Sequence, residues 1–270
     1  MKRGGRQEAD ELILGRNSVL EVLRAGRRRV SRVYVADGAR ATGALAEILR
    51  LARARKILVE TGAARDWERP GEKSHGVAAE VSPYSYAALE DILHAAAALG
   101  QAPLVLLLDE VQDPQNVGTL LRTAEATGVH GVVLPYRHAA GITPAVVRAS
   151  SGASEHLMVA AENLAQAVER LQQESIQVVG LEAGAAARPL DEVDLVRPVA
   201  LVVGSEGEGM RRLVRERCDV LAGLAVGGRL GSLNAAVAGS IALYQAWSRR
   251  RAAAEEGASG AVRIDAPRES

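Results

Sequence analysis

Residues that could do chemistry gather at the start of a predicted helix in the stretch "DPQNVGTLLRTAEATGVHG", residues 113–131. Asn116 stands two residues before a glycine, and Arg122 lies beside the apolar helix positions 117, 120, 121 and 124 rather than opposite them. An arginine placed there can reach back over the loop that precedes the helix. Two plainer interpretations remain open: Asn116 as a helix cap, and Arg122 as a surface arginine whose stem covers apolar neighbours.

Two further loops carry polar residues, "GSEGEG" at 204–209 and "GSLNAA" at 231–236. The first follows an apolar strand, but it lacks the G-x-G-x-x-G spacing and the lysine of the nucleotide-binding loops. Glu206 and Glu208 would repel a pyrophosphate, and they suit a ligand that is polar and not polyanionic. A tight strand–helix turn is the alternative. In the second loop, Ser232 or Asn234 could simply cap the last helix.

From Pro103 onward, apolar strands alternate with amphipathic helices, beginning with the continuous apolar run "LVLLLD". Such runs are typical of parallel strands covered on both faces. The predicted fold class is therefore α/β, an open parallel sheet with helices on both faces. Ligands of such sheets lie beyond the carboxyl ends of the strands, which would bring the loops 113–118, 204–209 and 224–234 together.

A smaller α/β unit precedes this part. In it, Asn17 is the predicted cap of a helix that ends at Gly26. The expected organisation is a disordered tail at 1–10, a small domain at 11–82, a linker at 83–102, a larger domain at 103–250 and a disordered tail at 251–270.

Composition narrows the function classes. Residues 1–82 carry 17 Lys+Arg against 11 Asp+Glu, a net charge of +6, and the remainder carries −6. This asymmetry indicates a polyanion-binding unit beside a more acidic one, or two solvated surfaces of different charge. The single cysteine and five scattered histidines argue against a disulfide or a metal site. The first residues lack the apolar region of a signal peptide and no run is long enough to span a membrane, so a cytoplasmic protein is expected.

The three loops, in this order and at this spacing, resemble the three motifs of the SpoU family, AdoMet-dependent RNA ribose 2′-O-methyltransferases of the SPOUT superfamily. The likeness covers roughly residues 11–248, and "ILGRNSVLEVLRAG" followed by "VSRVYV" resembles the L30e-like substrate-binding domain of many members. The resemblance implies a C-terminal trefoil knot in the larger domain, AdoMet (S-adenosyl-L-methionine) bound in that knot, and a homodimer that completes the site. Within the family, the chain looks closest to the enzymes that methylate a guanosine of 23S rRNA.

The resemblance also implies roles for individual residues. The family's catalytic positions match Asn116, Arg122, Glu206, Ser232 and Asn234. Its cofactor-binding positions match Val203, Gly204, Ser205, Gly207, Leu224, Val226 and Leu233. Where the family usually reads Ile-Pro-Met, this chain reads Leu224-Ala225-Val226, without the proline that would stiffen the adenine pocket.

Because a guanidinium stays protonated, we expect Arg122 to hold an RNA phosphate and to lower the pKa of the ribose hydroxyl, rather than to act as a base. Phosphate contacts from the basic N-terminal part would position the RNA. The candidate contacts are Arg16, Arg27, Arg28, Arg29 and Arg32, and a solvated turn is the alternative for the arginine run. The same chemistry on tRNA or another rRNA site, such as an antibiotic-resistance site, and an inactive RNA-binding relative are the alternative functions.

Overall fold

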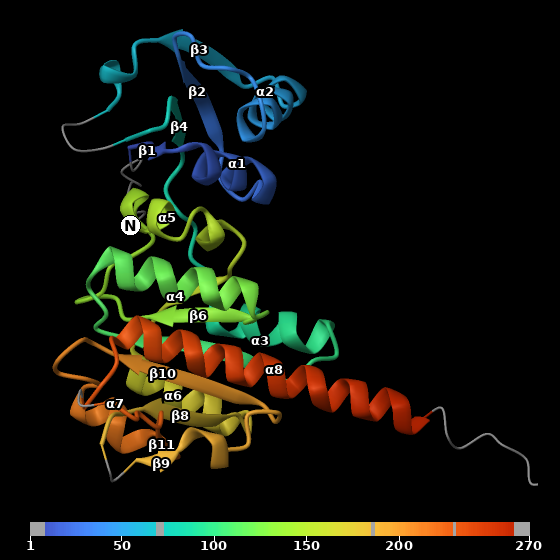
Figure 1. The fold of residues 1–270 in the computed structure, drawn as a ribbon, viewed down its shortest axis with the longest axis vertical. Helices are drawn as coiled ribbons and strands as arrows, with labels where there is room; N and C mark the ends of the chain where they lie inside the picture. The colour runs from blue at the N-terminus through green and yellow to red at the C-terminus, as the bar shows by residue number, and fades with distance from the viewer. Residues whose placement is uncertain (1–8, 69–72, 185–186, 229–230, 262–270) are drawn as a thin grey trace, which may run out of the picture.

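The computed structural model describes residues 9–68, 73–184, 187–228 and 231–261. Two sheets are stacked along the long axis of the molecule (Figure 1). The first is four-stranded, with the order β1-β4-β2-β3, and the second is seven-stranded, with the order β7-β6-β5-β10-β8-β11-β9. The chain passes from the first sheet to the second once, between β4 and α3.

The first sheet and its two helices occupy the N-terminal part. The elements are β1 (Glu11–Leu14), α1 (Arg16–Ala25), β2 (Val30–Ala36), α2 (Ala44–Ala54), β3 (Leu58–Gly62) and β4 (Val77–Val81). As expected, α1 ends at Gly26, which adopts the left-handed conformation. The predicted cap of α1 is wrong: the helix begins two residues earlier than that cap implies, at Arg16, and its N-cap is Gly15 rather than Asn17.

The second sheet is parallel throughout and its core strands are buried on both faces. Its strands are β5 (Leu104–Asp109), β6 (Gly131–Leu134), β7 (Val159–Ala161), β8 (Gln177–Leu181), β9 (Arg188–Pro189), β10 (Val199–Gly204) and β11 (Val220–Gly223). Alternate residues of β5 and β10 belong to two separate apolar clusters, one on each side of the sheet. The apolar runs therefore form doubly covered parallel strands, as predicted.

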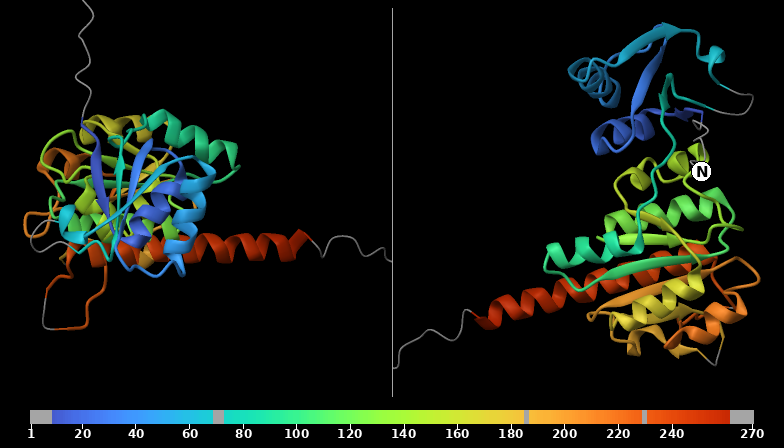
Figure 2. Two further views of the ribbon diagram at one scale, coloured as in Figure 1. Left: turned by 90° about the horizontal axis from the view of Figure 1, so that it is seen from above. Right: turned by 180° about the vertical axis from the view of Figure 1, so that it is seen from behind.

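Helices cover both faces of this sheet. They are α3 (Leu89–Ala98), α4 (Pro114–Ala126), α5 (Pro144–Ala149), α6 (Leu164–Gln173), α7 (Arg212–Arg217) and α8 (Ala235–Ala261). Figure 2 shows α8 extending well beyond the body of the molecule. None of the helices in the described part of the chain is both long and apolar enough to cross a membrane.

Two expected boundaries differ from the structure. The segment 83–102, expected as a linker ending in a short helix, does contain a helix, but this helix is packed on the second sheet, because Leu89, Ile92 and Ala96 of α3 form an apolar face that is fully buried there. Residues 251–261, expected as part of a disordered tail, continue α8. Their Ala, Arg and Glu residues are strong helix formers, and Arg251 pairs with Glu255 at 3.6 Å. Residues 1–8 and 262–270 of the expected tails lie outside the described residues, and the domain boundaries at 11–82 and 103–250 stay predictions.

Candidate functional site

Three polar side chains from distant parts of the sequence meet at the carboxyl edge of the second sheet. The Nδ2 atom of Asn116 donates to Glu206 Oε2 at 3.2 Å. The Nδ2 atom of Asn234 donates to the same Glu206 oxygen at 3.0 Å and to Asn116 Oδ1 at 3.2 Å. We call Asn116, Glu206 and Asn234 the polar triad. The loops at 113–118 and 204–209 and the described residues of the loop 224–234 therefore lie together, as the sheet architecture predicts.

Local structure places two members of the triad on helix ends. Asp113 caps α4 by accepting a hydrogen bond from the Gln115 backbone N–H at 3.0 Å, and Pro114 occupies the first helical turn. Asn116 thus projects from the first turn and is not the cap. Asn234 caps α8, because its Oδ1 accepts from the N–H groups of Ala236 at 2.9 Å and Val237 at 3.2 Å.

The loop that carries Glu206 is closed on itself. The backbone of Ser205 exchanges hydrogen bonds with Gly209, at 3.0 and 3.1 Å. A Cβ atom on Gly204 would lie 2.2 Å from the Gly209 carbonyl carbon, so only glycine allows this close approach. The loop is therefore a tight turn, and it also presents Glu206 to the triad.

A buried carboxylate anchors the end of this loop. Asp109, at the end of β5, is fully buried and accepts from the Arg211 backbone N–H at 2.7 Å and from its Nε at 2.8 Å. The NH2 atom of the same guanidinium lies 2.7 Å from Asp109 Oδ1. The role of Asp109 as an anchor depends on the pairing of β5 with β10, which sets its carboxylate beside the end of the loop.

A cavity of about 760 Å³ opens between the loops 204–210 and 224–235. All seven positions expected to bind a cofactor line it: Val203, Gly204, Ser205, Gly207, Leu224, Val226 and Leu233. Glu206, Ser232 and Asn234 line it too. The sequence interpretation missed the wall formed by Leu181–Gly184 at the carboxyl end of β8, although its position after a strand was a usable signal.

The Arg122 side chain points toward Ser151 rather than toward the polar triad. The side chain is exposed, and its NH1 atom donates to Ser151 Oγ at 3.3 Å. Ser151 follows α5 and has a positive φ of 55°. Arg122 therefore projects toward the junction of the two sheets, and no hydrogen bond joins it to the polar triad within the described part of the chain.

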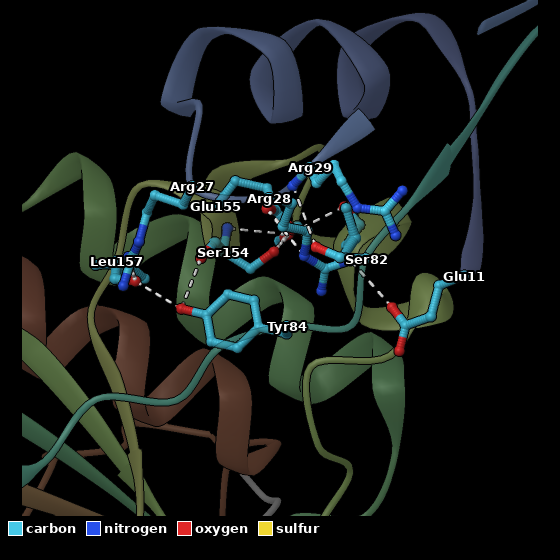
Figure 3. Close-up of polar contacts among 11 residues, drawn as sticks. Glu11, Arg27, Arg28, Arg29, Ser82, Tyr84, Ser154, Glu155 and Leu157 are labelled. Atoms are coloured by element: carbon cyan, nitrogen blue, oxygen red, sulfur yellow. Dashed lines mark hydrogen bonds and ion pairs between the residues drawn. The ribbon is translucent and has the colours of Figure 1, made fainter. Parts of the chain in front are cut away.

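The arginines expected to contact RNA are mostly engaged within the protein (Figure 3). Arg28 is buried between Glu11, at 3.0 Å, and Glu155, at 3.3 Å. Arg27 donates to the Leu157 carbonyl oxygen, and Arg29 pairs with Asp10 at 2.8 Å. Because a side chain that is 1% exposed cannot reach a phosphate, Arg28 is excluded from an RNA surface and belongs to the junction between the two parts.

Arg16 and Arg32 complete the set. Arg32 pairs with Glu60 at 2.9 Å and is partly exposed. The Nε atom of Arg16 donates to the His75 carbonyl oxygen at 3.0 Å, and Arg16 lines a second cavity between the two parts. Thus carboxylates largely neutralise the predicted basic run. Among the five candidate arginines, Arg16 is the one that lines this cavity.

Burial perturbs the pKa of two groups that do not line the cavity. Burial raises the pKa of the Cys218 thiol to about 12, with further contributions from Asp219 and Asp109. Burial also raises the pKa of Tyr84, whose hydroxyl donates to the Leu157 carbonyl oxygen at 2.7 Å, to about 12. Both groups are therefore neutral at physiological pH and have structural roles.

Family models match two segments of the chain. The model described as the SpoU rRNA Methylase family matches residues 103–244, and the model described as RNA 2′-O ribose methyltransferase substrate binding matches residues 12–87. A protein of Bacillus subtilis (strain 168), YacO, named as a TrmH family tRNA/rRNA methyltransferase, is 38% identical over 247 residues, which cover 91% of this chain and 98% of that protein.

Other relatives and solved structures agree with these matches. A tRNA/rRNA methyltransferase of Mycolicibacterium smegmatis is 38% identical over 93% of this chain and 80% of its own length. The fold is similar to that of the SpoU methyltransferase AviRb from Streptomyces viridochromogenes in complex with AdoMet, with a TM-score of 0.75, 23% identity and coverage of 92% and 95%. A TrmH family protein from Porphyromonas gingivalis has a TM-score of 0.68, 25% identity and coverage of 90% of each chain.

Proposed function

The chain belongs to the SpoU rRNA methylase family of RNA methyltransferases, and we propose that it methylates the 2′-hydroxyl of a ribose in structured RNA with AdoMet as the methyl donor. The observation that carries the proposal is the cavity beside the polar triad, where the three loops of the family motifs meet. The substrate-binding model over residues 12–87 supports an RNA substrate.

The residues around the cavity fit AdoMet. Its volume of about 760 Å³ lies within the range of small-molecule sites. Backbone of the glycine-rich turn lines one wall, and Glu206 and Glu208 supply negative charge there. A carboxylate suits the positively charged sulfonium and would repel a polyphosphate cofactor. When bound, AdoMet supplies an activated methyl group whose leaving group departs neutral.

This chain's residues then have to position the ribose and remove a proton. A bond forms between the ribose O2′ and the methyl carbon as the sulfur–carbon bond breaks, and the hydroxyl proton leaves to an RNA phosphate or to solvent. Placement of the reactants can contribute about 7–11 kcal/mol to lowering such a barrier. We assign to Arg122 the binding of a phosphate next to the target ribose, where its charge lowers the pKa of the hydroxyl.

We assign different roles to the other matched residues. In this proposal, Asn116 and Asn234 hold the Glu206 carboxylate at the cavity, through the hydrogen bonds described above. Ser232 lines the cavity and would contact the cofactor or the ribose edge. The alanine at position 225, where the family usually has proline, leaves the adenine side of the cavity less constrained.

A guanosine of 23S rRNA is the proposed target, and tRNA is the alternative because the relatives' names include both. The trefoil knot around the loops 204–210 and 224–235 and a cytoplasmic location also stay proposals.

The proposed assembly is a homodimer. On α8, Val237, Ile241 and Tyr244 are spaced four and three residues apart and are 45%, 38% and 59% exposed. This apolar stripe, positioned next to the loop 224–234, suits contact with a second copy of the chain.

The test is methyl transfer from labelled AdoMet to unmodified transcripts of 23S rRNA and to a tRNA pool, followed by digestion to nucleosides and mapping. The proposal expects label on a ribose of one of these RNAs, and the labelled transcript decides between the two targets. Label on a base, or AdoMet binding without any transfer, would contradict the proposed reaction; the second result would favour an inactive RNA-binding relative.

A further inference from the structure

We propose that the cleft between the two parts of the molecule holds the phosphodiester backbone of the RNA next to the target nucleotide. This inference rests on the proposed function, because it names where that function's substrate is held. The cleft has a volume of about 650 Å³. The residues that line it are Leu14, Gly15, Arg16, Asn17, Ser18, Lys73, His75, Arg148 and Ser151.

Both parts of the molecule contribute to this cleft. Arg16 begins α1, and Lys73 and His75 precede β4 of the first sheet. Arg148 lies on α5 and Ser151 follows it, so these two come from the methyltransferase part. A ligand in the cleft would therefore contact the substrate-binding segment and the catalytic segment at once.

The charge of the cleft is positive. Arg16, Lys73 and Arg148 line it together with His75, and no carboxylate is among the lining residues. Neither Lys73 nor Arg148 forms an ion pair with any residue that the structure describes. By contrast, Arg28, Arg29 and Arg32 already pair with carboxylates. Cations without internal partners are the ones available to phosphates, which dominate RNA affinity.

A hydroxyl adds a polar group to the wall. Ser18 lines the cleft, and its Oγ atom forms no hydrogen bond with the residues that the structure describes. A phosphate oxygen at this wall would accept a hydrogen bond from Ser18 while the cations neutralise its charge.

The cleft also leads to the proposed site of reaction. Ser151 lines the cleft and accepts the hydrogen bond from the Arg122 NH1 atom. A strand of RNA whose backbone lies between Arg16 and Arg148 would thus pass Arg122 at the end of its path. This arrangement explains why Arg122 projects toward the junction rather than toward the polar triad.

The walls of the cleft are fixed by close contacts between the two parts. Gly152 has a φ of +87°, and a Cβ atom there would lie 2.6 Å from Glu21 Cβ of α1. Glu21 Oε2 lies 2.7 Å from His156 Nε2. The buried Arg28–Glu155 pair, seen beside Tyr84 in Figure 3, lies at the same junction. The cleft is therefore preformed, which limits the entropy lost when RNA binds.

The experiment compares the double variant Lys73→Ala/Arg148→Ala with Arg53→Ala/Arg65→Ala. The control pair removes the same charge from exposed residues that do not line the cleft. Binding to transcripts of 23S rRNA and to a tRNA pool is measured over a range of salt concentrations. The plot of log K against log salt has a negative slope, and each lost phosphate contact reduces its magnitude by about 0.7 for single-stranded RNA.

We expect the magnitude of this slope to be smaller by about 1.4 in the cleft variant, because two phosphate contacts are lost. The variant should bind RNA roughly tenfold more weakly and bind AdoMet with unchanged affinity. Lys73→Arg/Arg148→Lys should restore the slope. If the cleft variant behaves like the control pair while wild type methylates RNA, the cleft proposal is wrong and the proposed function stands. If the slope falls as expected but wild type transfers no methyl group, the proposed function fails and the cleft stands as an RNA site.

Discussion

Asn234 has two structural tasks that use different atoms of one amide. Its Oδ1 caps α8, and its Nδ2 donates to Asn116 and Glu206. The side chain thereby joins the start of the last helix to the loops that precede it. A helix cap and a polar site are often alternative interpretations of an asparagine in a sequence; here the structure combines them.

Substitution of Asn234 should separate these two tasks. Asn234→Ala removes both, so we expect a loss of about 1 kcal/mol in unfolding free energy from the missing cap, together with weaker AdoMet binding. Asn234→Asp keeps the capping oxygen but replaces the donor with a charge that repels Glu206. It should unfold close to the wild-type denaturant concentration and still bind AdoMet poorly. Equal AdoMet affinity in wild type and Asn234→Asp would exclude a role for the triad in the cofactor site.

Arg122 should matter for turnover and little for folding. Because the side chain is exposed and its hydrogen bond with Ser151 is 3.3 Å long, Arg122→Ala should leave the unfolding transition unchanged. Loss of a charged group at the reacting hydroxyl typically lowers kcat by about 100-fold or more. Ser151→Ala is the matched variant that removes only the hydrogen bond and should have a much smaller effect. A wild-type kcat in Arg122→Ala would refute the assignment.

Cys218 provides a test of pH dependence. Its folded pKa of about 12 is above the value for a free thiol, so the neutral form is favoured in the fold. Its contribution to stability is present below the unfolded pKa, about 8.5, and is lost as the pH rises through 12. At pH 8.5 the native thiol should therefore react with iodoacetamide far more slowly than in denaturant. Similar rates in both conditions would contradict the burial of the thiol.

At the scale of elements, the contact between α1 and the segment after α5 sets the geometry of the cleft. We expect Gly152→Ala to lower the unfolding free energy by about 1–3 kcal/mol from backbone strain, and further because its Cβ would collide with Glu21. Gly38→Ala is the control, since Gly38 has a φ of +74° and nothing lies within 4 Å of its Cβ position. Denaturant unfolding of both variants gives the difference, and equal losses would show that the close contact contributes nothing.

Several elements could be predicted from the sequence because their signals are local. Thr143 caps α5 with Pro144 in its first turn, Asn163 caps α6, and Gly26 ends α1, each as the residue types indicate. The apolar runs of β5 and β10 also identified a parallel sheet, and the rule for parallel sheets brought the three loops together. Local signals thus predicted most of the fold and the place of the cavity.

Other features depend on contacts that no local pattern contains. The burial of Arg28 requires Glu155, which is 127 positions away and on the other part of the molecule. The direction of Arg122 depends on where α5 ends, and Arg148, Lys73 and His75 come together only when the two sheets meet. A run of arginines in a sequence therefore indicates charge, but the tertiary fold decides which of those charges remain available.

At the scale of the whole molecule, the exposed stripe of α8 predicts an association. Ile241→Glu/Tyr244→Glu should convert the proposed dimer to a monomer, because charges would be buried at the contact. Leu99→Glu is the matched control, since Leu99 is 65% exposed and is the C-cap residue of α3, away from α8. Sedimentation velocity gives the mass of each variant. A wild-type monomer at micromolar concentration would contradict the dimer without affecting the assignment of the cavity.

The most direct test of the central claim is calorimetric titration of AdoMet into wild type and into Glu206→Gln. Glu206→Gln keeps the size of the side chain and removes its charge at the cavity. Wild type should bind one AdoMet per chain and Glu206→Gln should bind it about tenfold more weakly, since a hydrogen bond to a charged group contributes about 1.5–3 kcal/mol. No heat of binding in wild type, or equal affinity in both proteins, would contradict this claim.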